Sequence, residues 1–200
     1  MLINIPRHWC IGLALLCATG MAAAQSDASR GAYIATAGGC IACHTADGKD
    51  AVRFAGGHAL KTPFGTFYGP NITPHPQAGI GRWSEADFVR AMREGVRPDG
   101  AHYFPAFPYT SYTKIMDKDL GDLWAYLRSL PPDARQNQPH ELQFPFGFRF
   151  LLAGWKMLFF KPGPMTTVTQ PGTPAARGEY LVNALSHCGE CHTPRNLLGG

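Results

Sequence analysis

The sequence predicts an all-α fold of a few short helices joined by long loops, with a partial repeat of that fold near the C-terminus. Three observations support this prediction. The 200 residues include 23 glycines and 17 prolines, which favours loops over long helices or broad sheets. Helical patterns are short and lie at about 29–37, 84–95 and 117–130. A Cys-x-x-Cys-His motif occurs twice. The net charge of +4 is small and scattered, which argues against a nucleic-acid partner.

The first 24 residues have the features of a cleaved secretion signal. Arg7 and His8 give a basic start, residues 9–21 are apolar, and three alanines at 22–24 match a small-residue cleavage site. The apolar run is shorter than the ~20 residues that a membrane-spanning helix needs. We therefore predict a signal peptide over residues 1–24 and export to the periplasm.

Four cysteines remain once Cys10 and Cys17 leave with the signal, and all four lie in Cys-x-x-Cys-His motifs. The motifs are Cys40, Cys43 and His44, and Cys188, Cys191 and His192. This is the attachment signature of c-type haem, in which both thiols reach the vinyl groups of one porphyrin and the histidine ligates the iron. Two disulfides are the usual alternative in an exported protein. A redox dithiol needs no histidine there, and a zinc site would need both pairs to converge on one metal. Two complete motifs favour haem c at both sites.

The residues ahead of the two motifs are also alike. Arg30-Gly31-Ala32-Tyr33-Ile34 precedes the first motif and Arg177-Gly178-Glu179-Tyr180-Leu181 precedes the second. This duplication predicts a haem domain over residues 25–133, a linker with an apolar helix over 134–174, and the start of a second domain over 175–200. Because the chain stops at Gly200 and no methionine follows Cys191, we expect the second domain to be incomplete.

The elements of the first domain follow in order. A helix over residues 29–37 ends at two glycines, just before the attachment cysteines. Residues 62–74 are rich in turn residues and aromatics and predict a loop that covers the porphyrin. A Ser-x-x-Asp capping box starts the helix over 84–95, which a glycine closes. The helix over 117–130 ends at two prolines, and we expect it to cross the first helix near Gly31.

Other stretches of the mature chain extend the pattern well beyond these motifs. They are residues 62–74, Trp83-Ser84, the run Met92 to Val96, Asp99-Gly100, and residues 103–109 (YFPAFPY). In these stretches the chain resembles the multihaem cytochrome c subunits of bacterial membrane-bound dehydrogenases, such as the alcohol and gluconate dehydrogenases. The resemblance implies a class I cytochrome c-like haem domain followed by a partial second one. It also implies an electron-transfer subunit without catalytic residues of its own. Such subunits take electrons from a dehydrogenase catalytic subunit in the periplasm and pass them to ubiquinone or a terminal oxidase.

One position departs from that family. The alcohol dehydrogenase subunits have a methionine in a Pro-Ala-Met-Pro context on the far side of the first iron, whereas this chain has Phe107, which cannot ligate. Met116 is our first candidate for the sixth ligand, with His102 and Met92 as alternatives, although Met92 also fits the buried face of its helix. An open sixth position would instead favour a haem enzyme, such as a dihaem peroxidase or a thiosulfate-oxidising cytochrome, in which His102 is the one candidate for acid–base chemistry.

Residues 144–160 are the most apolar stretch of the mature chain, interrupted by Arg149 and Lys156. The stretch is too short to span a bilayer. It reads either as an interfacial helix with its cations at the lipid headgroups, or as a linker helix packed between domains or against a partner subunit. So large an apolar patch is unusual on a freely soluble electron shuttle. We therefore expect contact with the cytoplasmic membrane surface or with a partner.

Overall fold

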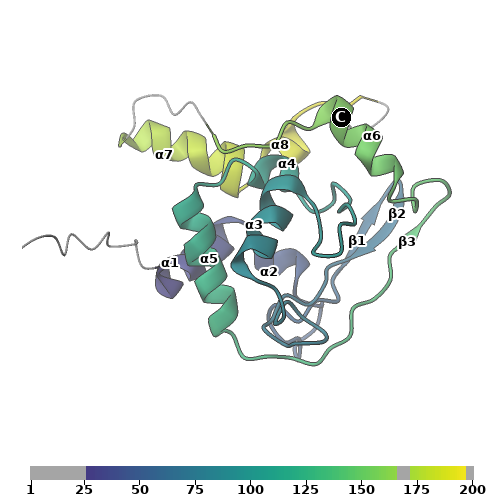
Figure 1. The fold of residues 1–200 in the computed structure, drawn as a ribbon, viewed down its shortest axis with the longest axis horizontal. Coiled ribbons are helices and arrows are strands. Elements are labelled where there is room, and N and C mark those ends of the chain that lie inside the picture. Colours follow the sequence, from purple (N-terminus) through teal and green to yellow (C-terminus); the bar gives the residue numbers. More distant parts are fainter. Residues whose placement is uncertain (1–25, 166–171, 197–200) are drawn as a thin grey trace, which may run out of the picture.

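The computed structural model describes residues 26–165 and 172–196, so the predicted signal peptide lies outside it. Helices α1 (Ala28–Ala37), α3 (Glu85–Glu94) and α5 (Asp117–Ser129) form the main body, with the short helices α2 (Cys40–Cys43) and α4 (Tyr109–Tyr112) between them (Figure 1). The later elements are α6 (Leu151–Phe159), α7 (Pro174–Tyr180), the π-helical turn η1 (Leu181–Leu185) and α8 (Gly189–His192). The predicted mainly helical fold is confirmed.

A small antiparallel sheet is the element that the sequence did not reveal. Strand β1 (Ala59–Thr62) pairs with β2 (Gly65–Tyr68), and β2 pairs with β3 (Glu141–Leu142). The prediction of an uninterrupted loop over 62–74 is therefore wrong for β2. Gly65 allows the close pairing, because its φ is +122° and a Cβ there would overlap the backbone of Glu141.

The predicted helix ends are largely confirmed. The Ser84 hydroxyl accepts from the Asp87 N–H at 3.1 Å, and the Asp87 carboxylate accepts from the Ser84 N–H at 3.1 Å, so the capping box is complete. Gly95, at φ 60°, ends α3 in the left-handed conformation that glycine adopts without strain. The last long helix of the first domain begins at Asp117 and ends one residue before the predicted Leu130.

The core lies where α1 and α5 cross. Gly31 sits at the crossing, and a Cβ there would overlap the carbonyl oxygen of Asp122 on α5, as the sequence predicted. Around it pack apolar residues of the first domain, including Ile34, Phe88, Met92, Leu120, Leu123 and Leu127. The same buried cluster includes residues that precede the second motif, namely Tyr180, Ala184 and Leu185. The approach to the second motif is therefore packed into the core of the first domain.

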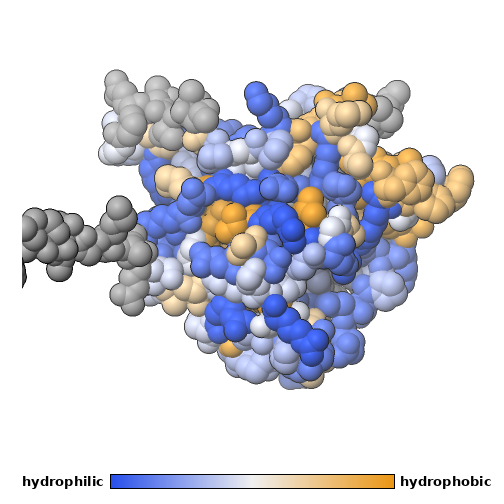
Figure 2. Space-filling model, viewed as in Figure 1, coloured by the Kyte–Doolittle hydropathy of each residue, from blue (hydrophilic) through white to orange (hydrophobic). Residues whose placement is uncertain are grey.

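The apolar stretch at 144–160 is helical only in α6, after a run of turns. Its cations point to the protein and not to solvent. Lys156 is only 8% exposed, and Arg149 donates to the carbonyl of His102 at 2.7 Å. Of the two interpretations of this stretch, the one that places its cations at lipid headgroups is therefore wrong for Lys156, and Arg149 is likewise bonded within the protein. The segment still leaves an exposed set, here called the apolar surface, visible at the right and top of Figure 2. It comprises Phe144, Phe146, Phe148, Phe150, Leu151, Met157 and Leu158. Among the described helices, none has the length and apolar character needed to cross a membrane.

Candidate haem site

Helix α2 presents the first pair of cysteines. It is a single turn, so Cys40 and Cys43 lie three residues apart on neighbouring positions of its surface. Gly39, at φ +64°, turns the chain from α1 into this helix. Burial raises the pKa of Cys40 to about 12 and also raises the pKa of Cys43, so both sulfurs are neutral thiols at pH 7.

Neither alternative use of the cysteines is found in the part of the chain that the structure describes. All four are free thiols, so the two motifs form no disulfide. Within residues 26–165 and 172–196, no three histidine, cysteine or acidic side chains converge on a point where a metal ion could sit. The thiols therefore remain available for thioether bonds.

The ring of His44 is oriented by a main-chain acceptor. Its Nδ1 lies 2.7 Å from the carbonyl oxygen of Pro70. A carbonyl only accepts, so Nδ1 carries the proton and the lone pair is on Nε2. Metal-binding histidines are held in this way by a second hydrogen bond. Burial lowers the pKa of His44, with the Pro70 contact opposing it, so the neutral ring is favoured at pH 7. Nε2 is thus prepared to bind an iron.

The loop that carries Pro70 lies directly on the attachment turn. The residue before it, Gly69, is so close to the Cys43 carbonyl that a Cβ would overlap that oxygen. On the other side, the Gly56 N–H donates to the His44 carbonyl at 2.8 Å. These contacts fix the backbone of His44 relative to the Pro70 acceptor.

The segment after α5 forms hydrogen bonds with the loop that carries Pro70. The buried Asn71 donates through its side-chain amide to the carbonyls of Asp133, at 2.8 Å, and Arg135, at 3.0 Å. Its main-chain N–H donates to the side chain of Asn137 at 2.7 Å. Because Asn71 follows Pro70 directly, this anchor also fixes the acceptor for His44.

Phe107, which stands where the resemblance implies a methionine, lies in an aromatic cluster. Its ring centroid is 5.2 Å from that of Tyr103, 5.7 Å from Tyr112 and 6.3 Å from Tyr109. Such rings can pack against a porphyrin, but their carbon atoms cannot ligate iron. The sixth ligand must therefore come from another residue, or the position is open.

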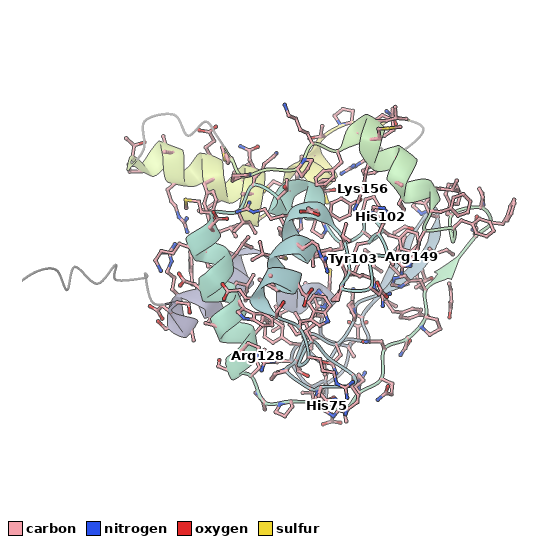
Figure 3. All side chains as sticks on the ribbon, in the orientation of Figure 1. His75, His102, Tyr103, Arg128, Arg149 and Lys156 are labelled. Atoms are coloured by element: carbon pink, nitrogen blue, oxygen red, sulfur yellow. The ribbon has the colours of Figure 1, made fainter. Side chains whose placement is uncertain are left out.

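His102 is engaged by a buried lysine. The Lys156 Nζ lies 2.9 Å from its Nδ1, and also 2.5 Å from the carbonyl of Glu94 and 2.7 Å from that of Gly95. These three acceptors match the three N–H groups of an ammonium. His102 therefore accepts at Nδ1 and carries its proton on Nε2, which leaves no lone pair for iron in this arrangement. Figure 3 shows the two side chains together below α6.

The other two candidates differ in their surroundings. Met92 is packed in the core, which agrees with the buried face predicted for it. Met116 stands at the start of α5, with 44% of its surface exposed. Its main-chain N–H donates to the Tyr180 hydroxyl at 3.1 Å. Met116 remains our prediction for the sixth ligand.

The second motif lies beside α4 (Figure 1). Cys188 comes just before α8, and Cys191 and His192 are on it. The carboxylate of Glu190, between the two cysteines, accepts from the hydroxyls of Thr110 at 2.8 Å and Ser111 at 3.2 Å. The second motif is therefore anchored on the first domain.

Comparison with known proteins identifies the family. Residues 28–131 match the family described as Cytochrome c. The chain belongs to the cytochrome c family. Its members carry haem c and transport electrons, and the first motif fits that group. The first motif has two neutral thiols on one helical turn and a histidine whose Nε2 lone pair is free to bind iron, and the aromatic cluster around Phe107 provides rings that can pack against a porphyrin.

The relatives confirm the predicted resemblance to dehydrogenase subunits. A "Diheme cytochrome c-type" protein of Cereibacter sphaeroides is 50% identical over 177 residues, which cover 86% of this chain and 59% of that protein. The cytochrome c subunit of the quinone alcohol dehydrogenase of Gluconobacter oxydans is 42% identical over 172 residues, covering 84% and 35%. The fructose dehydrogenase cytochrome subunit of Gluconobacter japonicus is 41% identical over 182 residues, covering 90% and 37%. The chain thus spans less than two thirds of the length of these relatives.

Sequence reasoning missed the groups that position the motifs. Pro70 acts through its main-chain carbonyl, so no side-chain pattern reveals its role, although it lies in the stretch predicted as a loop. Tyr112 and His187 contact each other from positions far apart in the chain. Lys156 looked like a break in an apolar run, and only the fold shows that it points inward.

Proposed function

We propose that this chain is a periplasmic c-type cytochrome that passes electrons from a dehydrogenase catalytic subunit towards ubiquinone or a terminal oxidase. Bound haem c would supply the one-electron chemistry. The observation that carries the proposal is the hydrogen bond from His44 to Pro70, because it presets Nε2 as an iron ligand. The dehydrogenase subunits among the relatives support the role of the partner.

The residues of the chain have separate tasks in this proposal. Cys40 and Cys43 would form thioethers with one haem, and His44 would ligate its iron through Nε2. The corresponding residues for a second haem are Cys188, Cys191 and His192. The aromatic cluster around Phe107 would help to exclude water from the first haem.

Covalent attachment is the decisive test. We expect the mass of the exported chain to include two haems that resist acid–acetone extraction. Cys40→Ala with Cys43→Ala should remove one, and Cys188→Ala with Cys191→Ala should remove the other. Each double variant is the control for the other. A wild-type chain without covalent haem would overturn the proposal.

A haem enzyme, such as a dihaem peroxidase or a thiosulfate-oxidising cytochrome, is the second candidate. It is favoured by Phe107, since an aromatic ring at that place leaves the sixth position without its family ligand. The optical spectrum of the ferric protein distinguishes the two. A low-spin iron supports electron transfer, and a high-spin iron supports the enzyme.

We also infer that the apolar surface contacts the cytoplasmic membrane. Burying one large apolar side chain is worth ~1.5–3 kcal/mol, so a few of them suffice for binding. Lys156 and Arg149 pack inward, so the lipid contact must come from apolar atoms.

Liposome flotation tests this contact. Met157→Glu with Leu158→Glu places two charges on the apolar surface and should abolish flotation. Val52→Glu with Leu60→Glu adds the same charge at exposed apolar residues elsewhere and should not. If all three proteins float equally, or none does, the membrane role is excluded. Co-purification with a dehydrogenase is then the test of a protein contact.

A further inference from the structure

One side chain contacts the approaches to both haem-attachment motifs. The buried Tyr112 donates its hydroxyl hydrogen to the carbonyl of Gly38 at 2.6 Å. Gly38 lies two residues before Cys40. The same tyrosine ring meets the imidazole of His187 edge to face, with centroids 5.5 Å apart. His187 directly precedes Cys188. Tyr112 therefore links the backbone of one motif to a side chain of the other.

The backbone at His187 is in an unusual conformation. Its φ is +41°, in the region that residues other than glycine rarely adopt. The preceding residue, Ser186, donates its hydroxyl hydrogen to the carbonyl of Ala37 at 3.2 Å. The π-helical turn η1 leads into this point. Backbone strain of this kind persists only where the surrounding contacts fix it. Here the contacts are those that join the two motifs.

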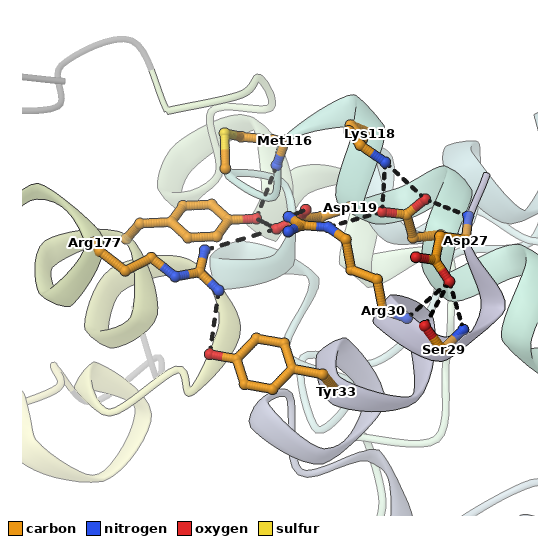
Figure 4. Close-up of polar contacts among 10 residues, drawn as sticks. Asp27, Ser29, Arg30, Tyr33, Met116, Lys118, Asp119 and Arg177 are labelled. Carbon is orange, nitrogen blue, oxygen red and sulfur yellow. Dashed lines mark hydrogen bonds and ion pairs between the residues drawn. The ribbon is translucent and has the colours of Figure 1, made fainter. Parts of the chain in front are cut away.

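A buried polar cluster fixes the other end of the same segment (Figure 4). The Tyr180 hydroxyl donates to the carboxylate of Asp119 at 2.8 Å and accepts from the Met116 N–H. Asp119 is fully buried on α5 and also pairs with Arg30 of the first domain. Arg177 lies 3.9 Å from the same carboxylate. The chain between Arg177 and Cys188 is thus held to the first domain at both ends.

We propose that Tyr112 and His187 are positioning residues that hold the second attachment motif against the first, and so set the separation and relative orientation of the two haems. This inference rests on the proposed function, because it needs haem at both motifs. Neither side chain touches the iron in this role. Their effect is to make the two haems a fixed pair within one packed unit.

Circular dichroism in the Soret band provides the readout, because two haems held in a fixed orientation give a paired positive and negative signal. The full haem-loaded chain is compared with His187→Gly, which removes the ring while glycine adopts the positive φ without strain. His187→Asn also tolerates this φ and lacks the ring. Both variants should weaken the paired signal, because the ring contact to Tyr112 is lost while the other contacts of the segment remain. Tyr112→Phe, which removes only the bond to Gly38, should weaken it and change the difference between the two haem potentials.

Tyr68→Phe is the matched control, since it removes a hydroxyl that bonds to Glu141 at the sheet. It should leave the paired signal unchanged. The intact mass is measured for every protein. Two haems by mass with an equal paired signal in wild type and both His187 variants would overturn the positioning role alone, as would two haems in wild type with no paired signal. A wild-type mass with a single haem would overturn the second haem site and this inference together.

Discussion

Replacing Lys156 with methionine removes a buried charge while keeping an unbranched apolar side chain. Burial lowers the pKa of Lys156 from 10.5 to about 8, with the charge of Glu94 opposing the shift. The unfolded chain keeps the ordinary value. Between about pH 8 and pH 10.5 the unfolded state therefore binds more protons than the folded state, so the unfolding free energy of the wild type rises with pH. One pKa unit corresponds to ~1.4 kcal/mol, which predicts a rise of ~3 kcal/mol that the methionine variant lacks.

This shift in the pKa of Lys156 determines how the difference in unfolding free energy between wild type and the methionine variant changes with pH. Below about pH 8 the ammonium is present in both states, and the gap in stability between wild type and variant is at its smallest. The variant still loses the donor to the Glu94 carbonyl, and an unpaired buried acceptor costs ~1–3 kcal/mol. The Gly95 carbonyl keeps a partner, because it also accepts from the Tyr103 N–H at 2.8 Å. The gap should then widen up to about pH 10.5 and become constant above it.

Urea unfolding followed by far-ultraviolet circular dichroism measures the gap at each pH, with the denaturant slope checked for constancy. Lys61→Met removes an exposed ammonium from β1 and controls for the change in net charge. A gap that is flat or narrows between pH 8 and 10.5 refutes the reasoning, since it would mean that the three acceptors stabilise the ammonium as much as burial disfavours it.

Three further predictions concern backbone packing and ligation. Gly69→Ala should lower the ratio of covalent haem to protein, because the new Cβ overlaps the attachment turn; a ratio equal to wild type would contradict this. Gly31→Ala should lower the unfolding free energy by ~1–3 kcal/mol through overpacking against α5. Gly178 occupies the equivalent place ahead of the second motif, and a Cβ there has no neighbouring atom within 4 Å in the described part of the chain. Gly178→Ala should therefore be neutral or stabilising by ~0.5–1 kcal/mol. Equal urea midpoints for the two variants would count against that contrast. Met116→Leu should remove the weak ferric band at the red end of the spectrum that a thioether ligand gives, and an unchanged spectrum would exclude Met116.

The helices of the first domain could be predicted because their signals are local. Apolar residues at helical spacing, a capping box and a closing glycine all lie within or beside the helix that they specify. The sheet offers no such signal. None of the four residues of β1 is buried, and they show no alternation of apolar and polar side chains, so the period that marks a half-buried strand is missing. Its third strand, β3, pairs with β2 from a distant part of the chain.

The same distinction applies to the site. The attachment residues are adjacent in sequence, and their spacing alone predicts their chemistry. The groups that orient them are not adjacent. The Pro70 carbonyl is 26 residues from His44, and Tyr112 is 74 residues from Gly38. A main-chain acceptor and a tyrosine in a run of aromatics carry no pattern that distinguishes them from their neighbours. The fold is needed to bring them to the motifs.

The duplicated motif shows most clearly why sequence similarity does not give equal surroundings. Arg30 and Arg177 occupy the same place in the two copies, yet both lie near one carboxylate, that of Asp119 on α5. In the first copy the neighbouring glycine is crowded by α5, and in the second it is open within the described residues. Tyr33 is half exposed, while its counterpart Tyr180 is buried with its hydroxyl on Asp119.

One face of α5 therefore serves both copies. Burial raises the pKa of Asp122, but hydrogen bonds from the Asp27 N–H, Lys118 and Arg30 outweigh it, so the net shift is downward and the carboxylate stays ionised at pH 7. Two buried acidic side chains of α5, Asp119 and Asp122, thus form ion pairs with Arg30 and hold α5 against α1. The remaining oxygen of Asp119 is then free to accept from Tyr180. A buried charge that loses one partner costs several kcal/mol. Replacing Arg30 by methionine would leave the buried Asp119 without its closer cation. This substitution should therefore weaken the attachment of the second motif, which depends on Asp119 through Tyr180, as well as the first domain.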